Sequence, residues 1–307
     1  MSHAILVGYD PRTRDRAPAR FGVAAARFTG APLIVACICA SGLGLLDEAL
    51  TGGADEALEE LEDELLSEGV SAQFRELRGV SAPRSLHEAA EADGAGLLVV
   101  GSAERGALGR VAPGSTAQRL MHGAPCPLAL VPAGWQPREA IRAIGVAYVD
   151  TEEAREALRG AHALAARAGA KMRVITVHTP HLGMYAETEA RKTIRPAKTV
   201  DQVEGEHRVR AERALQAAIA ELGDEVPVEV DAYAEDDPAD VLIRVSEHLD
   251  LLVCGSRGYG PVRAVLLGSV SRRVTAEAHS PVIVLARGVK AALEELMAPE
   301  PATAEPV

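Results

Sequence analysis

The chain has 307 residues, a formal net charge of −12 at pH 7 and a sequence pI of about 5.3. This length allows two domains of ordinary size, each with a core of its own. The acidic balance argues against nonspecific attraction to nucleic acids or to anionic membranes. The sequence has neither a membrane-spanning apolar run nor a signal-peptide pattern, so we expect a cytoplasmic protein that binds no nucleic acid and no membrane.

Strand and helix patterns alternate through the first part of the chain, residues 1–134, which we expect to form one domain. Short apolar runs predict buried strands at residues 4–9, 33–38, 70–77, 96–101 and 128–131. Helical spacing predicts helices at residues 17–28, 55–68 and 83–92. The alternation predicts an α/β domain with a doubly wound parallel sheet and right-handed crossovers.

The polar stretch 134–139 separates this domain from a second one, which we place at residues 140–288. Its strands are expected at residues 141–148, 171–177, 226–233, 249–255 and 282–285, and its helices at residues 152–168, 205–222 and 238–248. The non-periodic residues 179–203 predict a mobile cover or an interaction segment. Residues 289–307, which end in a stretch rich in Pro, Ala and Glu, are expected to form a disordered tail.

Cysteine and histidine positions favour structural roles. The four cysteines lie within or beside predicted strands, have no CxxC spacing and are expected to be buried, reduced thiols: Cys37, Cys39, Cys126 and Cys254. The histidines are scattered without metal-ligand spacing, so we expect no metal site. The sequence also offers no evident general base or Walker lysine, and we therefore expect no catalytic site.

The strand predicted at residues 249–255 leads into a glycine-rich loop and a new helix. Gly255 and Gly258 would let the backbone turn sharply and approach a ligand closely. Gly268 and Ser269 would start the helix, whose unpaired N–H groups attract anions. The first half repeats this arrangement, with Gly101-Ser102 and Gly114-Ser115 separated by the same interval. The pattern predicts a phosphate-binding α/β unit used twice.

The glycine spacing resembles the nucleotide-binding signature of the universal stress protein family, in the form Gly255-x2-Gly258-x9-Gly268-Ser269. The resemblance covers nearly the whole chain in two tandem copies. It implies two tandem, Rossmann-like domains with five parallel strands each, of the adenine nucleotide alpha-hydrolase-like type. Such domains bind ATP in some members of the family and no nucleotide in others. The loop is neither a Walker loop nor a dinucleotide fingerprint.

The resemblance also implies a set of nucleotide-binding residues in each copy. In the second copy these residues are Gly255, Gly258, Gly268, Ser269, Val270, Ser271, Val177 and Asp150. In the first copy they are Asp10, Ile38, Gly101, Gly106, Gly109, Gly114 and Ser115. The family's Asp contacts the nucleoside end of ATP, and the residues at the ends of the second strands contact the base through their backbone.

Each copy departs from the family pattern at a different place. Glu104 replaces the equivalent of Gly258 in the first copy and adds a negative charge near the expected phosphates. In the second copy Val149 stands in the place of Asp10, and Asp150 follows one residue later, where its carboxylate could point away from the site. Because the triphosphate carries most of the ligand's charge, we expect the second copy to bind ATP more tightly.

The function predicted from this resemblance is binding of ATP, with or without Mg²⁺, as a regulatory or sensing ligand in the stress response. Any hydrolysis is expected to be slow and incidental. The alternative is a scaffold of the same fold that forms a homodimer or holds an unknown protein partner without nucleotide. A third reading, an enzyme of the ATP pyrophosphatase kind, would need a Ser-Gly-Gly-x-Asp-Ser loop, which the chain lacks after both first strands.

Overall fold

The protein is described here by a computed structural model, which covers residues 3–40, 45–79, 81–105, 111–113, 115–178, 200–235, 237–255 and 269–285, together with Leu293 and Leu296. The first domain runs in the order β1 (Ile5–Tyr9), α1 (Ala17–Thr29), β2 (Leu33–Ala40), α2 (Leu45–Ser67), β3 (Gln73–Gly79), α3 (Ala82–Ala92), β4 (Leu97–Gly101), β5 (Ala103–Arg105), β6 (Val111–Pro113), α4 (Ser115–Met121) and β7 (Leu128–Val131).

The second domain repeats the order of the large strands and of the helices in the residues that the structure describes. Its elements are β8 (Ala143–Ala147), α5 (Glu152–Ala168), β9 (Lys171–His178), α7 (Val200–Ala220), β10 (Val228–Ala234), α8 (Pro238–Ser246), β11 (Leu251–Gly255), α9 (Ser269–Glu277) and β12 (Val282–Leu285). Helix α5 has the bounds that the sequence predicts. Thr151 caps its start by accepting a hydrogen bond from Ala154 N at 3.2 Å, and Gly169 ends it at φ 61°.

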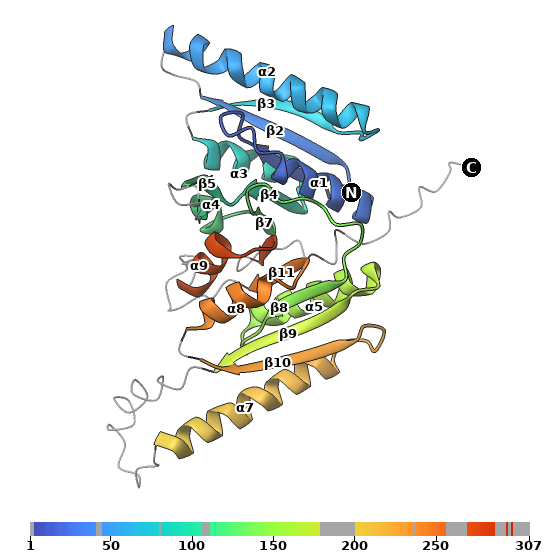
Figure 1. Ribbon diagram of the computed structural model, residues 1–307, viewed down its shortest axis with the longest axis vertical. Helices are drawn as coiled ribbons and strands as arrows, with labels where there is room; N and C mark the ends of the chain where they lie inside the picture. The colour runs from blue at the N-terminus through green and yellow to red at the C-terminus, as the bar shows by residue number, and fades with distance from the viewer. Residues whose placement is uncertain are drawn as a thin grey trace, which may run out of the picture.

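The strands form two parallel five-stranded sheets that join into one sheet of ten strands. The order is β10-β9-β8-β11-β12-β7-β4-β1-β2-β3, and each half therefore has the doubly wound arrangement that the alternating pattern predicts. Within this ten-stranded sheet, the two halves meet through the antiparallel pairing of β7 with β12, with Val282 opposite Leu130 and Val284 opposite Leu128. This pairing places the two domains side by side, with α2 and α7 at opposite ends of the molecule (Figure 1).

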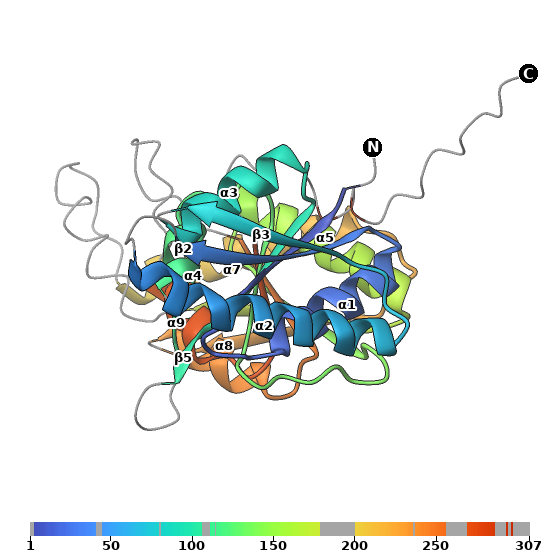
Figure 2. The same cartoon turned by 90° about the horizontal axis from the view of Figure 1, so that it is seen from above.

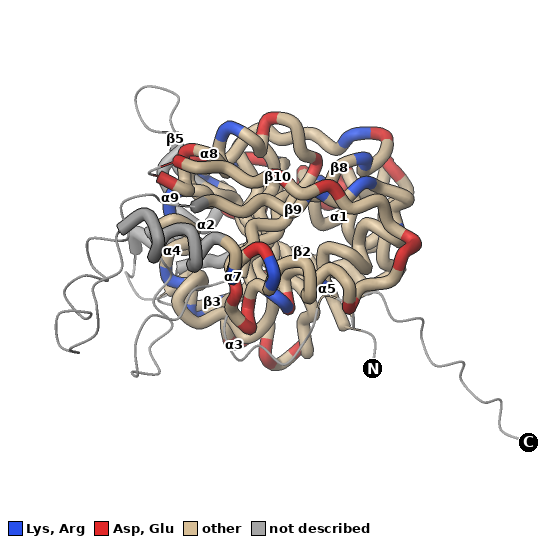
Figure 3. The backbone as a smooth tube through the Cα atoms, turned by 90° about the horizontal axis from the view of Figure 1, so that it is seen from below, with Lys and Arg blue, Asp and Glu red and all other residues tan. Residues whose placement is uncertain are grey.

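Two apolar cores fill the two faces of the sheet and both continue from one domain into the other. One core packs α1, α2, α5 and α7 against side chains such as Val7, Val99 and Val146. The other packs α3, α4, α8 and α9 against side chains such as Leu98 and Leu252. Seen from above, the helices surround the twisted sheet (Figure 2). Basic and acidic residues are interspersed along the described backbone, as Figure 3 shows.

Several boundaries differ from those that the sequence predicts. Helix α2 begins at Leu45 rather than near residue 55, and α7 begins at Val200, so residues 200–203 of the expected non-periodic segment are helical. The rest of that segment, with its basic residues, lies outside the described residues. The expected disordered tail is wrong at Leu293 and Leu296, which are 2% and 6% exposed in the first of the two cores. These two leucine side chains are apolar and are stabilised by burial in that core. The rest of residues 289–307 lies outside the described residues.

Three of the four cysteines have the buried environment that the sequence predicts. Cys37, Cys126 and Cys254 are buried and form no disulfide. Burial raises the pKa of the Cys126 and Cys254 thiols to about 12, because the thiolate would lose its hydration. Cys39 lies in β2, and its side chain is outside the described part of the structure.

None of the helices in the described ranges has the length and apolar content of a transmembrane segment. The described residues also contain no group of three or more His, Cys, Asp or Glu side chains placed to hold a metal ion.

Candidate functional site

A pocket of about 120 Å³ opens at the carboxyl ends of β8, β9 and β11 in the second domain. Strand β8 lies between β9 and β11, so the strand order reverses at this point. Crevices at such reversals are the usual ligand sites of doubly wound sheets. The lining residues are Ala147, Tyr148, Val149, Thr151, Ala154, Ile175, Val177, Pro238, Leu242, Cys254, Gly255, Val270, Ser271 and Val274.

The start of α9 forms one wall of this pocket. Val270 and Ser271 lie in the first turn of the helix, which begins at Ser269 and carries no acidic residue in that turn. The first N–H groups of a helix have no partner within it, and the aligned peptide dipoles make this end positive. The wall therefore offers hydrogen-bond donors to an anion.

Gly255 has a packing role that the sequence did not reveal. A Cβ atom at this position would lie 2.7 Å from the carbonyl carbon and oxygen of Glu153 and 2.9 Å from Ala154 N. The first turn of α5 therefore fills the space in which the glycine pattern predicts the approach of a ligand. At the equivalent Gly101 of the first domain, a Cβ would lie 3.4 Å from Pro18 Cγ, which requires only a small adjustment.

The carboxylate expected near the nucleoside does not line the pocket. Val149 does so, whereas Asp150 forms an ion pair of 2.6 Å with Arg155. The extra residue before the carboxylate explains this placement, because one position along an extended chain reverses the side-chain direction. Asp150 is therefore beside the pocket but paired outside it.

In the first domain, Asp10 follows β1 and is bound by Arg12. The Arg12 Nε and Nη2 atoms donate to the two carboxylate oxygens of Asp10 at 3.1 and 3.0 Å, and Arg12 N donates to Oδ1 at 3.0 Å. The Asp10 carboxylate is thus paired with the positive charge of Arg12 in the absence of a ligand. Ile38 lies in β2 and Gly101 ends β4, so both belong to neighbouring strands of β1.

The glycine-rich connection of the first domain contains a small hairpin that the sequence did not predict. Strands β5 and β6 pair antiparallel, with Glu104 opposite Ala112 and Arg105 opposite Val111. Strand β6 also packs against α9 of the second domain. Glu104, expected near the phosphates of the first copy, is therefore part of a strand at the domain junction. Ser115 is the first residue of α4.

Four of the predicted site residues lie together in the pocket: Val177, Gly255, Val270 and Ser271. Ser269 adjoins them as the first residue of α9. The predicted glycines Gly258, Gly268, Gly106, Gly109 and Gly114 lie outside the described residues.

Sequence reasoning missed two hydroxyl-bearing lining residues, Tyr148 and Thr151. Tyr148 contributes a neutral phenol near pH 7, and burial raises the pKa of this phenol above its ordinary value. Thr151 could have been found, because a threonine directly before Glu152-Glu153 and an apolar period is a helix N-cap signal. The apolar lining residues of β9, α8 and α9 offer no comparable signal, since ordinary core positions have the same pattern.

The fold and the pocket define a class: a tandem doubly wound α/β protein with a small-molecule pocket at the strand-order reversal. Comparison with known proteins identifies the family, since the model of the universal stress protein family matches residues 1–132 and again residues 140–286. The chain belongs to the universal stress protein family.

Relatives share this organisation over much of their length. A universal stress protein of Mycolicibacterium smegmatis is 28% identical over 306 residues, which cover 92% of this chain and 97% of the relative. One from Mycobacterium tuberculosis is 27% identical, covering 72% of this chain and 74% of the relative. The crystal structure of a universal stress protein from Archaeoglobus fulgidus matches with a TM-score of 0.66 and 18% identity, over 94% of this chain and 100% of that one.

Proposed function

We propose that the protein binds an adenine nucleotide, ATP foremost, as a regulatory or sensing ligand in the stress response. The observation that carries this proposal is the second-domain pocket, which joins the strand-order reversal to the open first turn of α9. A crevice with helical N–H donors at one end is suited to a ligand with a flat ring and an anionic group.

The size and polarity of the pocket indicate how the ligand would lie. A volume of about 120 Å³ is near that of a cavity which accepts one small aromatic ring. None of the described lining residues is charged, and hydroxyls come from Tyr148, Thr151 and Ser271. We infer that one ring of the base enters the apolar part, between Val177 and Leu242, that the rest of the base stays at the open mouth of the pocket, and that the phosphates extend along the start of α9.

We propose binding rather than hydrolysis as the activity of this site. The described lining residues include no His, Asp, Glu or Lys that could act as a general base or hold a metal ion. Mg²⁺ would then accompany the phosphates of ATP rather than bind a protein site of its own. The location in the cytoplasm and the formation of a homodimer are further proposals, the latter testable by light scattering of the purified full chain.

Calorimetric titration of the full chain with ATP, AMP and cAMP tests the proposal. Cyclic AMP is included because one solved universal stress protein is described in complex with cAMP. Val177→Trp should abolish the tightest binding step, because the indole would fill the pocket. Ile38→Trp, at the matching position of the first domain, is the control and should leave that step unchanged.

If the Val177→Trp variant still showed the tightest binding step, the nucleotide would bind at another site. Absence of binding for all three nucleotides at millimolar concentration would contradict the proposal and favour the alternative, a scaffold that holds a protein partner. The engagement of Asp10 by Arg12 and of Asp150 by Arg155 is the observation that favours this alternative.

A further inference from the structure

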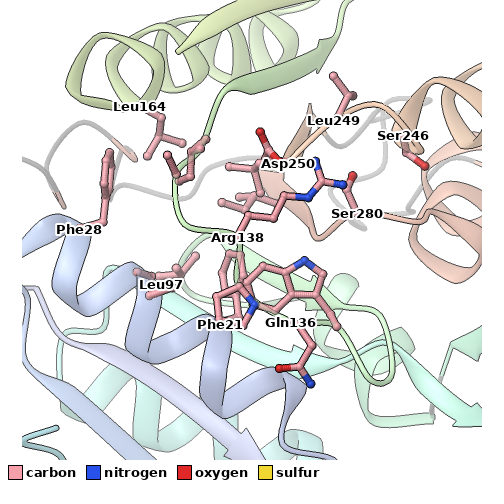
Figure 4. Close-up of a pocket in the computed structure, with 18 of the residues that line it drawn as sticks. Phe21, Phe28, Leu97, Gln136, Arg138, Leu164, Ser246, Leu249, Asp250 and Ser280 are labelled. Atoms are coloured by element: carbon pink, nitrogen blue, oxygen red, sulfur yellow. Dashed lines mark hydrogen bonds and ion pairs between the residues drawn. The ribbon is translucent and has the colours of Figure 1, made fainter. Parts of the chain in front are cut away.

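A second, larger cavity lies between the two domains, at the edge of the sheet opposite the nucleotide pocket. Its volume is about 220 Å³, and it is lined by the first residues of two central strands, Leu97 of β4 and Leu251 of β11. Helix α1, the inter-domain segment 135–141 and helix α5 supply further walls (Figure 4). Because the amino ends of these strands surround it, this cavity is separate from the pocket at their carboxyl ends.

Aromatic and aliphatic side chains make most of the cavity wall. Phe21, Phe28, Leu97 and Leu164 face one another around it in Figure 4. Phe21 also packs edge-to-face on Trp135, with ring centroids 5.5 Å apart and an interplanar angle of 65°. The rings tie the inter-domain segment to α1 and hold this wall in place. A cavity of 150 Å³ accepts benzene, so about 220 Å³ suits a molecule of roughly nine or ten non-hydrogen atoms.

One buried hydroxyl in the lining has no partner among the described residues. Ser280 is 3% exposed, and its Oγ atom makes no hydrogen bond to them. Ser246 lines the same cavity but is satisfied, since its Oγ donates to Ile243 O at 2.6 Å and accepts from His279 N at 2.9 Å. An unpaired buried hydroxyl costs free energy, and a ligand that pairs with it removes this cost.

The charged groups of the lining already have polar partners. Asp250, whose side chain is 7% exposed, accepts hydrogen bonds from Arg138 Nη1 at 2.6 Å, Arg142 N at 2.7 Å and Ala143 N at 2.9 Å. His279 lies 3.4 Å from Glu247. Figure 4 shows Arg138 extending across the cavity towards Asp250 and Ser280. A charged ligand would have to compete with these pairs in a partly desolvated space, so an uncharged ligand is favoured.

We propose that this inter-domain cavity is a binding site for a small, uncharged and largely apolar molecule that carries one hydroxyl or carbonyl group, with Ser280 as its hydrogen-bond partner. Both domains and the segment between them contribute to the walls, so the bound molecule stabilises their association. The site is independent of the nucleotide site and of its proposed function.

The test compares two probes that share a phenyl body and differ in one hydroxyl, 2-phenylethanol and ethylbenzene. Heteronuclear NMR titration of the full chain should give a dissociation constant below about 1 mM for 2-phenylethanol, which is within the range for a ligand of this size. Ethylbenzene should bind about five- to tenfold more weakly, because it leaves Ser280 unpaired. Saturating ATP should not displace either probe.

Two variants separate the roles of the hydroxyl and of the cavity. Ser280→Ala should keep the binding of ethylbenzene and remove the preference for 2-phenylethanol. Ala25→Phe, from the α1 wall, should abolish the binding of both probes, and circular dichroism checks that it folds. Equal affinity of the wild-type chain for both probes would overturn the role of Ser280. No binding of either probe, or tighter binding of 3-phenylpropanoate than of 2-phenylethanol, would overturn the proposed site or its ligand class.

Discussion

The two domains have the same strand order, yet they differ where the first strand meets the first helix. In the second domain, Thr151 caps α5, and the helix starts so close to β11 that only a glycine fits at position 255. In the first domain, the N-cap residue of α1, Arg16, makes no capping hydrogen bond with its side chain, and the equivalent Gly101 has more room. The same residue type is thus required by packing in one copy and only tolerated in the other, so a shared motif does not imply a shared physical reason.

The largest expected effect of this difference is on stability. Gly255→Ala should destabilise the protein by about 1–3 kcal/mol, because its Cβ meets the backbone of α5, which cannot rotate away as a side chain could. Gly101→Ala is the matched change and should stay within about 0.5 kcal/mol. Urea denaturation followed by circular dichroism measures both. Equal losses for the two variants would mean that the domains do not differ at this contact.

The cap of α5 should have the next largest effect. Thr151→Ala removes the acceptor for Ala154 N and should cost about 1 kcal/mol of unfolding free energy. Thr151→Ser keeps an oxygen at this position and is the control, with a much smaller loss. If the alanine variant matched the wild-type midpoint in urea, the hydrogen bond seen at the start of α5 would contribute nothing to stability.

A smaller effect is expected on nucleotide affinity in the first domain. We predict two unequal steps in a calorimetric titration with ATP, with the second domain binding more tightly. Glu104→Gly should lower the dissociation constant of the weaker step by about threefold, because it removes one negative charge from the neighbourhood of the phosphates. Glu104→Gln separates loss of charge from gain of backbone freedom. A change confined to the tighter step would show that the order of the two sites is reversed.

The smallest effect concerns one buried thiol in each domain. Cys126 and Cys254 have pKa values of about 12 in the folded protein, against about 9 for an unperturbed thiol. The unfolded chain therefore loses these protons first, and stability falls as pH rises from about 9 towards 12. At pH 9 each thiol should account for a loss of about 0.4 kcal/mol relative to pH 7.

The measurement is urea denaturation of the wild type and of Cys126→Ala and Cys254→Ala at both pH values. Each variant should lose less stability between pH 7 and pH 9 than the wild type does. An unchanged pH dependence in both variants would contradict the assignment to these thiols.

Much of the secondary structure could be predicted because its causes are local. Helical periodicity, the threonine before Glu152 and the glycine at 169 define α5 at both ends. Four-residue apolar runs that directly follow a proline define β7 and β12. The start of α2 at Leu45 was missed, because its first turns contain Gly52 and Gly53, which are weak helix formers.

For the functional site, the sequence located the strand ends and the start of α9, which bring Val177, Gly255, Val270 and Ser271 to one pocket. It also indicated that Asp150, one residue out of step with Asp10, could point away from that pocket. Only the structure showed which partner holds it there, Arg155. The ion pair between Asp150 and Arg155 depends on the position of the first turn of α5 relative to β8. The order of residues along the chain does not specify this position.

The sequence by itself determined the number of domains, the order of the strands of the large sheet along the chain, and the family, because apolar periodicity and glycine spacing repeat along the chain. The tertiary structure decided how the domains meet. The antiparallel pairing of β7 with β12 brings two distant edges together, and the cavity beside it is closed by Phe21, Leu164 and Leu293, which are far apart in sequence. Local pattern carries no information about such contacts, because they depend on the shapes of surfaces that exist only after each domain has folded.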